Sequence, residues 1–207
     1  MKSELPDLAL KALEALIDGN ERFKAGASTQ ARQDPARRSE VAEGQHPRAA
    51  IVGCSDSRVA PEIVFDQGLG DVFVVRTAGN LVDQLGVESL EYAAAHLGVP
   101  LIVVMGHSRC GAVEAAARGT HGRPSAIQSA LAPSLEAAKG RTRNRLDAAA
   151  RENARMIAAA LESREGVLKG LVDEGSLHIL GAFYDIERGT VEFFSHGDSL
   201  GAISEQA

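Results

Sequence analysis

The stretch AAIVGCSDSRV, residues 49–59, begins as a continuous apolar run and ends in a cluster of chemically reactive side chains. An apolar run without alternation is typical of a strand that is buried on both faces, as in a parallel sheet. Directly after the run come Cys54, Asp56 and Arg58. In open α/β sheets ligands bind beyond the carboxyl ends of the strands, so this stretch predicts both a strand and the place of a site.

Further apolar runs recur along the chain and are separated by segments with helical spacing. Val87, Leu90 and Ala94 mark one helix, residues 124–173 are predicted to be largely helical, and a turn signal at 187–189 favours a closing hairpin. The expected strands are AAIVG at 49–53, DVFVVR at 71–76, PLIVVMG at 100–106 and LHILGAFY at 177–184. This alternation predicts an α/β fold with a mostly parallel central sheet flanked by helices and an antiparallel edge strand near the C-terminus.

The N-terminal part of the chain is expected to form a helical arm. Apolar residues recur at helical spacing over residues 7–24, whereas residues 25–47 are polar and read as a connector that crosses a surface. A length of 207 residues fits one α/β domain. We therefore expect a single domain over residues 1–207, with residues 1–47 as its N-terminal helical arm.

Composition narrows the class of partner. The formal net charge is −6, and aromatic residues make up only 4% of the chain with no tryptophan, which argues against nucleic acid or an anionic membrane surface as the partner. No run approaches the roughly 20 apolar residues of a membrane span, and the N-terminus lacks the apolar core of a signal peptide. These observations favour a cytoplasmic protein.

Two cysteines and a histidine are expected to meet at one edge of the sheet. Cys54 directly follows the run 49–53, and His107 directly follows the run 100–106, so both arrive at the same edge if these strands are neighbours. Cys110 opens the next helix, where the helix dipole favours a thiolate. Two thiolates and an imidazole suit zinc, and three protein ligands leave a fourth position open, as in catalytic zinc sites.

Asp56 and Arg58 are separated by one residue, so their side chains can meet in a tight turn. An arginine fork keeps a carboxylate ionised and fixes its orientation. Alone, the pair would be interpreted as a structural ion pair. Beside a three-ligand zinc site, it provides a hydrogen-bond acceptor next to the metal, or a fourth ligand if Asp56 turns toward the metal.

Two motifs together resemble those of the β-class carbonic anhydrases. They are CSDSRV at 54–59 and GHSRCGA at 106–112. RTAGN at 76–80 and ALIDGNERFKAG at 15–26 are similar to two further segments of that family. The resemblance covers nearly the whole chain, and the paired motifs are highly specific.

The resemblance implies an enzyme that reversibly hydrates carbon dioxide to bicarbonate and a proton through zinc-bound hydroxide. It implies one Zn²⁺ per subunit, held by Cys54, His107 and Cys110. It also implies that Asp56 and Arg58 form a catalytic pair, with Asp56 as a fourth zinc ligand in a closed state.

The resemblance further implies residues for the substrate pocket and an oligomer. Gln45, Phe73 and Tyr92 correspond to the family's substrate-binding residues, and the tyrosine lies near a dimer interface. Family members are dimers or larger assemblies, so a homodimer or homotetramer is expected, with the arm 1–47 packed on a neighbouring subunit.

Two other functions remain open from the sequence. One is a related zinc hydrolase that acts on carbonyl sulfide or carbon disulfide, because the same ligand motif would serve it. The other is a zinc-holding or redox-sensing module without turnover, with Cys54 and Cys110 as its dithiol. The Asp56–Arg58 pair and Gln45 argue against the second, since a sensor has no need of either.

Overall fold

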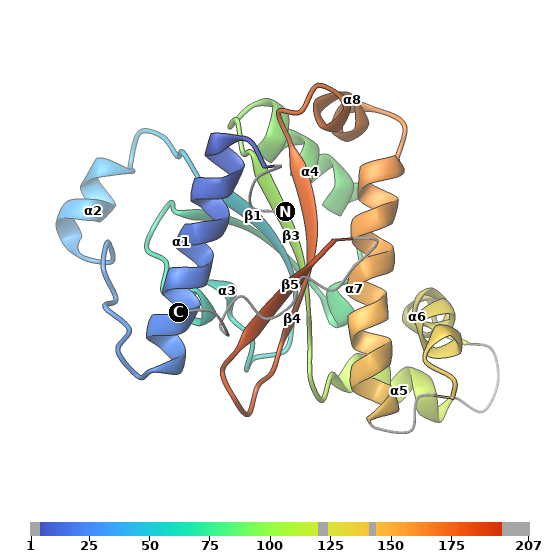
Figure 1. Ribbon diagram of the computed structural model, residues 1–207. Coiled ribbons are helices and arrows are strands. Elements are labelled where there is room, and N and C mark those ends of the chain that lie inside the picture. Colours follow the sequence, from blue (N-terminus) through green and yellow to red (C-terminus); the bar gives the residue numbers. More distant parts are fainter. Residues whose placement is uncertain (1–4, 120–123, 141–143, 196–207) are drawn as a thin grey trace.

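The sheet of the computed structural model is mostly parallel with one antiparallel edge pair, as the sequence predicts. The structure describes residues 5–119, 124–140 and 144–195. Over these residues the strands are β1 (Ala49–Cys54), β2 (Val72–Thr77), β3 (Leu101–His107), β4 (His178–Tyr184) and β5 (Val191–Phe194). They form one sheet in the order β2-β1-β3-β4-β5, in which all neighbours are parallel except β4 and β5 (Figure 1). The predicted fold class, with its antiparallel C-terminal edge strand, is confirmed.

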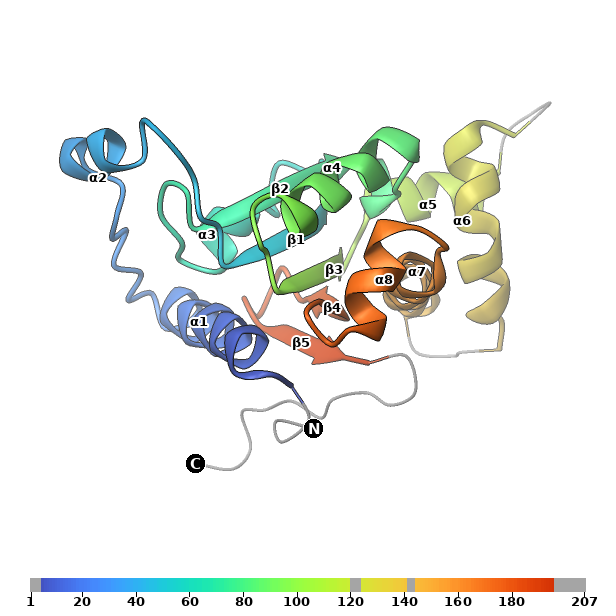
Figure 2. The same ribbon diagram turned by 90° about the horizontal axis from the view of Figure 1, so that it is seen from above.

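Helices cover both faces of this sheet. Helix α1 lies on one face, and α7 and α8 lie on the other (Figure 2). The helices are α1 (Asp7–Lys24), α2 (Pro35–Glu40), α3 (Pro61–Val64), the 3₁₀ helix η1 (Ala78–Asn80), α4 (Gln84–Ala95), α5 (Gly111–Arg118), α6 (Ala126–Ala137), α7 (Arg145–Ser163) and α8 (Val167–Asp173). The predicted helical segment 124–173 thus contains α6, α7 and α8, and its residues 141–143 lie outside the described residues. None of the described helices is long and apolar enough to cross a membrane.

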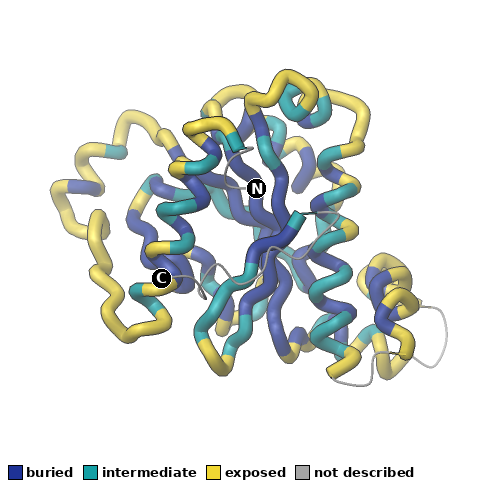
Figure 3. The backbone as a smooth tube through the Cα atoms, in the orientation of Figure 1, coloured by how far each residue is buried: buried dark blue, intermediate teal, exposed yellow. Residues whose placement is uncertain are grey.

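The central strands are buried on both faces, which explains their unbroken apolar sequences. Every residue of β1 and of β3 is buried (Figure 3). Helix α7 approaches β3 closely at Gly106, where an added Cβ would lie only 2.6 Å from the carbonyl oxygen of Ala150. Only glycine allows this approach, and it seats α7 against β3 immediately before His107.

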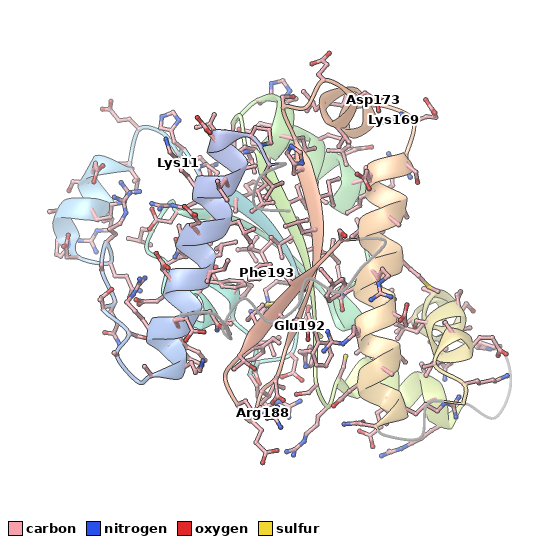
Figure 4. All side chains as sticks on the ribbon, viewed as in Figure 1. Lys11, Lys169, Asp173, Arg188, Glu192 and Phe193 are labelled. Atoms are coloured by element: carbon pink, nitrogen blue, oxygen red, sulfur yellow. The ribbon has the colours of Figure 1, made fainter. Side chains whose placement is uncertain are left out.

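Edge strand β5 is covered on both of its faces. Successive residues of a strand point to opposite faces, and Glu192 and Phe193, labelled in Figure 4, do so here. Glu192 forms an ion pair of 2.8 Å with Arg151 of α7. The ring of Phe193 stacks on Phe65 with centroids 6.1 Å apart. The strand is therefore held by α7 on one side and by the segment after α3 on the other.

Helix α1 has the predicted bounds and packs on its own chain. Leu13 and Leu16 are fully buried. Near the C-terminal end of the helix, the buried Asn20 side chain donates hydrogen bonds to the carbonyls of Val64 and Gly189 at 3.1 and 2.9 Å. The contact of this arm with a neighbouring subunit stays a prediction.

The polar segment 25–47 contains one short helix, which its sequence pattern did not indicate. Helix α2 begins after Asp34, whose side chain accepts a hydrogen bond from the backbone N–H of Arg37 at 2.8 Å. The Arg37 side chain is 9% exposed and bonds to the carbonyl of Leu69 at 2.8 Å. The connector is thus attached to the body of its own chain.

Asp66 attaches the end of α1 and the residues that follow it to the turn after α3. Its side chain is 2% exposed and accepts hydrogen bonds from Arg22 Nε at 2.6 Å, from the N–H and hydroxyl of Thr29 at 3.0 Å and from the N–H of Gln30 at 3.1 Å. Burial alone would raise the pKa of this carboxyl, but the hydrogen bonds from Arg22, Thr29 and Gln30 outweigh it and lower the pKa from 3.8 to about 2.

The Asp66→Asn substitution is expected to lower the free energy of unfolding by about 2 kcal/mol at neutral pH, because the ionised carboxylate is the form that folding favours. Asparagine tolerates the left-handed backbone of this position, where φ is 45°. Since the folded pKa lies below the unfolded one, the stabilisation is complete above pH 4 and is lost as the pH falls from about 4 to about 2. Denaturant unfolding of both proteins across this range should show their difference vanishing. A constant difference would contradict this assignment.

Candidate metal centre

The structure brings Cys54, His107 and Cys110 together at the carboxyl edge of the sheet. Cys54 is the last residue of β1 and His107 the last of β3, and these two strands pair directly. Cys110 stands at the N-cap of α5. The three residues are buried, and their candidate ligand atoms all lie within 4.8 Å of one another. Among the described residues, these three form the group that could hold a metal ion.

The histidine presents a free nitrogen in this group. His107 is 1% exposed, and its Nδ1 lies 2.9 Å from the carbonyl oxygen of Ser108. Since a carbonyl only accepts, Nδ1 carries the hydrogen and Nε2 keeps a lone pair. Among the described residues Nε2 has no hydrogen-bond partner although it is buried. A buried nitrogen without a partner, beside two thiols, fits a metal ligand.

The two thiols are electrostatically coupled. A hydrogen bond from Cys110 is the main cause that lowers the pKa of Cys54, to about 3, and the nearby His107 and the N–H groups of Asp56 and Gly79 add to it against the effect of burial. These N–H groups lie 3.4 and 3.3 Å from the Cys54 sulfur. The same shared hydrogen bond, together with burial, raises the pKa of Cys110. The site thus already favours a thiolate at Cys54.

Asp56 is paired with Arg58 and stands apart from the three-residue group. The guanidinium binds the carboxylate with two bonds, Nε to Oδ1 at 2.9 Å and Nη2 to Oδ2 at 2.7 Å. The backbone N–H of Arg58 adds a third at 2.9 Å. These contacts with Arg58 lower the pKa of Asp56 to about 2, so the carboxylate is ionised at neutral pH. In this arrangement Arg58 engages both carboxylate oxygens of Asp56.

Arg58 also joins the two segments that carry the candidate ligands. Its Nη2 donates to the carbonyl of Arg109 at 3.1 Å, between His107 and Cys110. Arg109 has a left-handed backbone with φ of 54°, and its N–H donates to the Asp147 carboxylate of α7 at 2.8 Å. Arg58 and Asp147 therefore fix the shape of this turn from its two sides.

Arg76 is a supporting residue that sequence reasoning missed. It stands near the end of β2 and donates to the carbonyls of Cys54 at 2.8 Å and of Asp56 at 2.6 Å. It thereby braces the turn that carries both residues. Its place in RTAGN was the available signal, but no spacing rule shows that this arginine reaches across to β1. Asp147 was missed for the same reason, because its contact joins residues 38 positions apart.

Known proteins of one family are similar to this chain in both sequence and fold. The carbonic anhydrase family matches residues 49–191. Carbonic anhydrase 2 of Mycobacterium tuberculosis is 40% identical over 196 residues, which cover 92% of this chain and 95% of that protein. Carbonic anhydrase of Mycolicibacterium smegmatis is 40% identical over 198 residues, with coverage of 93% and 96%.

The solved structures identify the class. One of two tetrameric β-carbonic anhydrases from Sordaria macrospora superposes with a TM-score of 0.67 at 27% identity, covering 92% of this chain and 98% of that one. This chain belongs to the β-carbonic anhydrase family. The membership accounts for a zinc-binding set of two cysteines and one histidine at the edge of an α/β sheet, and the geometry of this β-carbonic anhydrase fits that metal.

One subunit of this β-carbonic anhydrase does not bring Gln45, Phe73 and Tyr92 to its own metal centre. Phe73 pairs with Ala50, four residues before Cys54 along β1, which is about 13 Å at the usual rise of a strand. Tyr92 of α4 is 47% exposed, and its ring lies 6.4 Å from that of Phe73. The exposed Gln45 precedes β1. These residues lie toward the amino edge of the sheet, and their role in substrate binding stays a prediction.

Proposed function

We propose that this chain catalyses the reversible hydration of carbon dioxide to bicarbonate and a proton, with zinc held by Cys54, His107 and Cys110. The observation that carries the proposal is the three-residue group with an ionised carboxylate fixed beside it. Because Arg58 holds Asp56, Cys54, His107 and Cys110 would hold the metal and leave a fourth position available for chemistry. Family membership supports the same activity.

The residues of the site have distinct tasks in this reaction. Zinc bound by these residues would lower the pKa of a coordinated water to about 7 and so would supply hydroxide near neutral pH. Cys54 and Cys110 bring negative charge to the metal, and His107 offers Nε2 because Ser108 engages Nδ1. Asp56 Oδ2 takes one bond from Arg58 and keeps capacity to accept a proton donor, which lets it orient the reacting oxygen.

Metal analysis combined with stopped-flow hydration of carbon dioxide tests this function. We expect about one zinc per chain and hydration above background at pH 7 to 9. The same protein is assayed with carbonyl sulfide and with carbon disulfide. Turnover of either sulfur compound without hydration would assign the related hydrolase function. Stoichiometric zinc without turnover of any of the three would contradict an enzyme and favour the zinc or redox module.

Gln45, Phe73 and Tyr92 are proposed to complete the pocket of a neighbouring subunit in a homodimer or homotetramer. Their distance from the metal centre of their own chain supports this, as do the exposure of Tyr92 and the tetrameric relatives. The apolar ring of Phe73 would line the path of a nonpolar gas, and Gln45 can donate to a substrate oxygen. The arm 1–47 of the single domain 1–207 would extend the same contact.

A shared site predicts that two inactive variants rescue each other. Cys54→Ala removes a metal ligand, and the double variant Phe73→Ala, Tyr92→Ala removes the pocket. Subunits of the two kinds, unfolded together and refolded as mixed dimers, should recover about a quarter of wild-type activity, since half of the dimers carry one intact site of two. Each variant refolded alone is the control. Absence of recovery in mixed dimers verified by mass spectrometry would contradict sharing.

A reducing compartment suits this function, and we place the protein in the cytoplasm. Both cysteines are free and buried, and both are needed as thiolates for the metal. Oxidation to a disulfide would remove two of the three ligands. Cytoplasmic thiol reductants prevent that reaction.

A further inference from the structure

Helix α7 directs a buried amide toward the metal centre. Asn153 is 3% exposed, and its Nδ2 donates to the carbonyl of Gly79 at 2.9 Å. The N–H of Gly79 in turn donates to the sulfur of Cys54 at 3.3 Å. The side chain of Asn153 therefore reaches a candidate ligand atom through a single residue.

We propose that Asn153 is a positioning residue that fixes the Gly79 N–H···S bond and so holds the Cys54 thiolate in place for the metal. The proposal rests on the metal role of Cys54 given above. It concerns how firmly the metal is held, and it does not depend on which substrate is turned over.

The Gly79 bond needs support from outside its own segment. The sulfur of Cys54 accepts hydrogen bonds from the N–H groups of Asp56 and Gly79. The N–H group of Asp56 belongs to the same turn as the cysteine. Gly79 belongs to η1, after strand β2, and has a left-handed backbone with φ of 70°. An isolated three-residue 3₁₀ turn has no helical ladder to fix its orientation. Its contacts with other elements must therefore set where this N–H points.

Those contacts are packing against β1, β3, α5 and α6 and the hydrogen bond from α7. An added Cβ on Gly79 would lie 3.3 Å from Ala112 and 3.5 Å from Leu131, so both helices press on this residue. Packing of this kind fixes position but offers no polar partner. Asn153 supplies that partner, and α7 is itself seated by the close approach of Ala150 to Gly106 one turn earlier.

An amide that donates to a thiolate sulfur acts on the metal in two ways. It restricts the sulfur to one position, and it draws off part of the negative charge that the sulfur gives to the metal. Removal of such outer contacts typically costs 10- to 100-fold in metal affinity. Loss of Asn153 should therefore change both the retention of the metal and the electronic signature of the metal–thiolate bond.

Asn20 provides a matched control for Asn153. It is similarly buried, at 4% exposed, and it also donates to backbone carbonyls from distant segments, those of Val64 and Gly189. Its hydrogen bonds within the described part of the chain, to Val64, Gly189 and Val191, reach neither η1 nor the candidate ligands. Replacing Asn20 with leucine should thus reproduce the structural cost of losing a buried amide and leave the metal centre unchanged.

The test compares Asn153→Leu with Asn20→Leu in two measurements. We expect release of zinc to a chelator to be about 10-fold faster in Asn153→Leu, and the thiolate-to-metal charge-transfer band of the cobalt-substituted protein to shift. Asn20→Leu should lower the melting temperature and change neither quantity. Asn153→Ser, whose hydroxyl can bond within its own helix, is a milder second variant. Unchanged release and an unchanged band in Asn153→Leu, or in Asn153→Ser if the leucine variant does not fold, would overturn the proposal.

A measurement on the wild-type protein tests the hydrogen bond from the Gly79 N–H to the Cys54 sulfur without any substitution. With an NMR-active cadmium isotope in place of zinc, the amide proton of Gly79 should show scalar coupling to the metal across the sulfur. Absence of that coupling would also overturn the proposal. Zinc that binds without carbon dioxide hydration would contradict the proposed function instead, because none of these readouts depends on turnover.

Discussion

Cys54→Ala is expected to abolish both zinc binding and hydration of carbon dioxide. The substitution removes one of three ligands from a buried site, and the remaining imidazole and thiol cannot close a tetrahedral coordination sphere around the metal. Zinc content should fall from about one per chain to near zero, and hydration should fall to the uncatalysed background. Elemental analysis after dialysis and stopped-flow assays measure the two quantities.

Ser57→Ala is the matched control for this prediction. The serine lies three residues after Cys54 in the same turn and is exposed, so its loss should change neither zinc content nor rate. Full zinc content or full activity in Cys54→Ala would refute the ligand assignment. A melting temperature close to that of the zinc-free wild type would show that the fold survives and that the loss is local.

Asp56→Asn is expected to lower turnover by about 10²-fold while zinc stays bound. The amide keeps the shape of the carboxylate but loses its charge and one acceptor. It can therefore neither accept from both Nε and Nη2 of Arg58 nor orient a proton donor in the same way. Zinc content should stay at about one per chain, because Arg58 rather than the metal engages this side chain. Single-turnover kinetics and elemental analysis on one preparation provide the measurement.

Asp83→Asn makes the same chemical change at a carboxylate that belongs neither to the three-residue group nor to the pair with Arg58. Asp83 caps α4 by accepting from the N–H of Gly86 at 2.9 Å, and asparagine caps a helix equally well. Its rate should match the wild type. If Asp56→Asn loses zinc, Asp56 is a resting ligand and the pairing with Arg58 is only one of two states.

Most of the fold follows from the sequence because its strands are buried on both faces. The sequences of such strands are unbroken apolar runs. The predicted strands 49–53 and 100–106 differ from the observed ones only by a residue at the ends. The spacing of apolar residues likewise gave the full extent of α1. The short helix α2 and the turn η1 escaped prediction, because caps and tertiary contacts rather than an apolar periodicity hold them.

The three candidate ligands were predictable and their supporting residues were not. Cys54 and His107 could be placed because the carboxyl ends of parallel strands share one edge. Arg76 and Asn153 act on backbone carbonyls of segments 20 to 74 residues away, and only the packing of the elements reveals such contacts. The location of Phe73 also needed the register of β2 against β1, which no local pattern specifies.

The direct pairing of β1 with β3 brings two of the candidate ligands together through the backbone. Backbone hydrogen bonds between these strands, and not the metal, determine how far Cys54 lies from His107. Small zinc-binding modules use the ion to build their structure, whereas here the chain must cross over and complete its sheet before the ligands become neighbours. We therefore expect zinc to bind after the sheet has formed, so that the supply of metal in the cell would limit how much of the protein is active rather than how much of it folds.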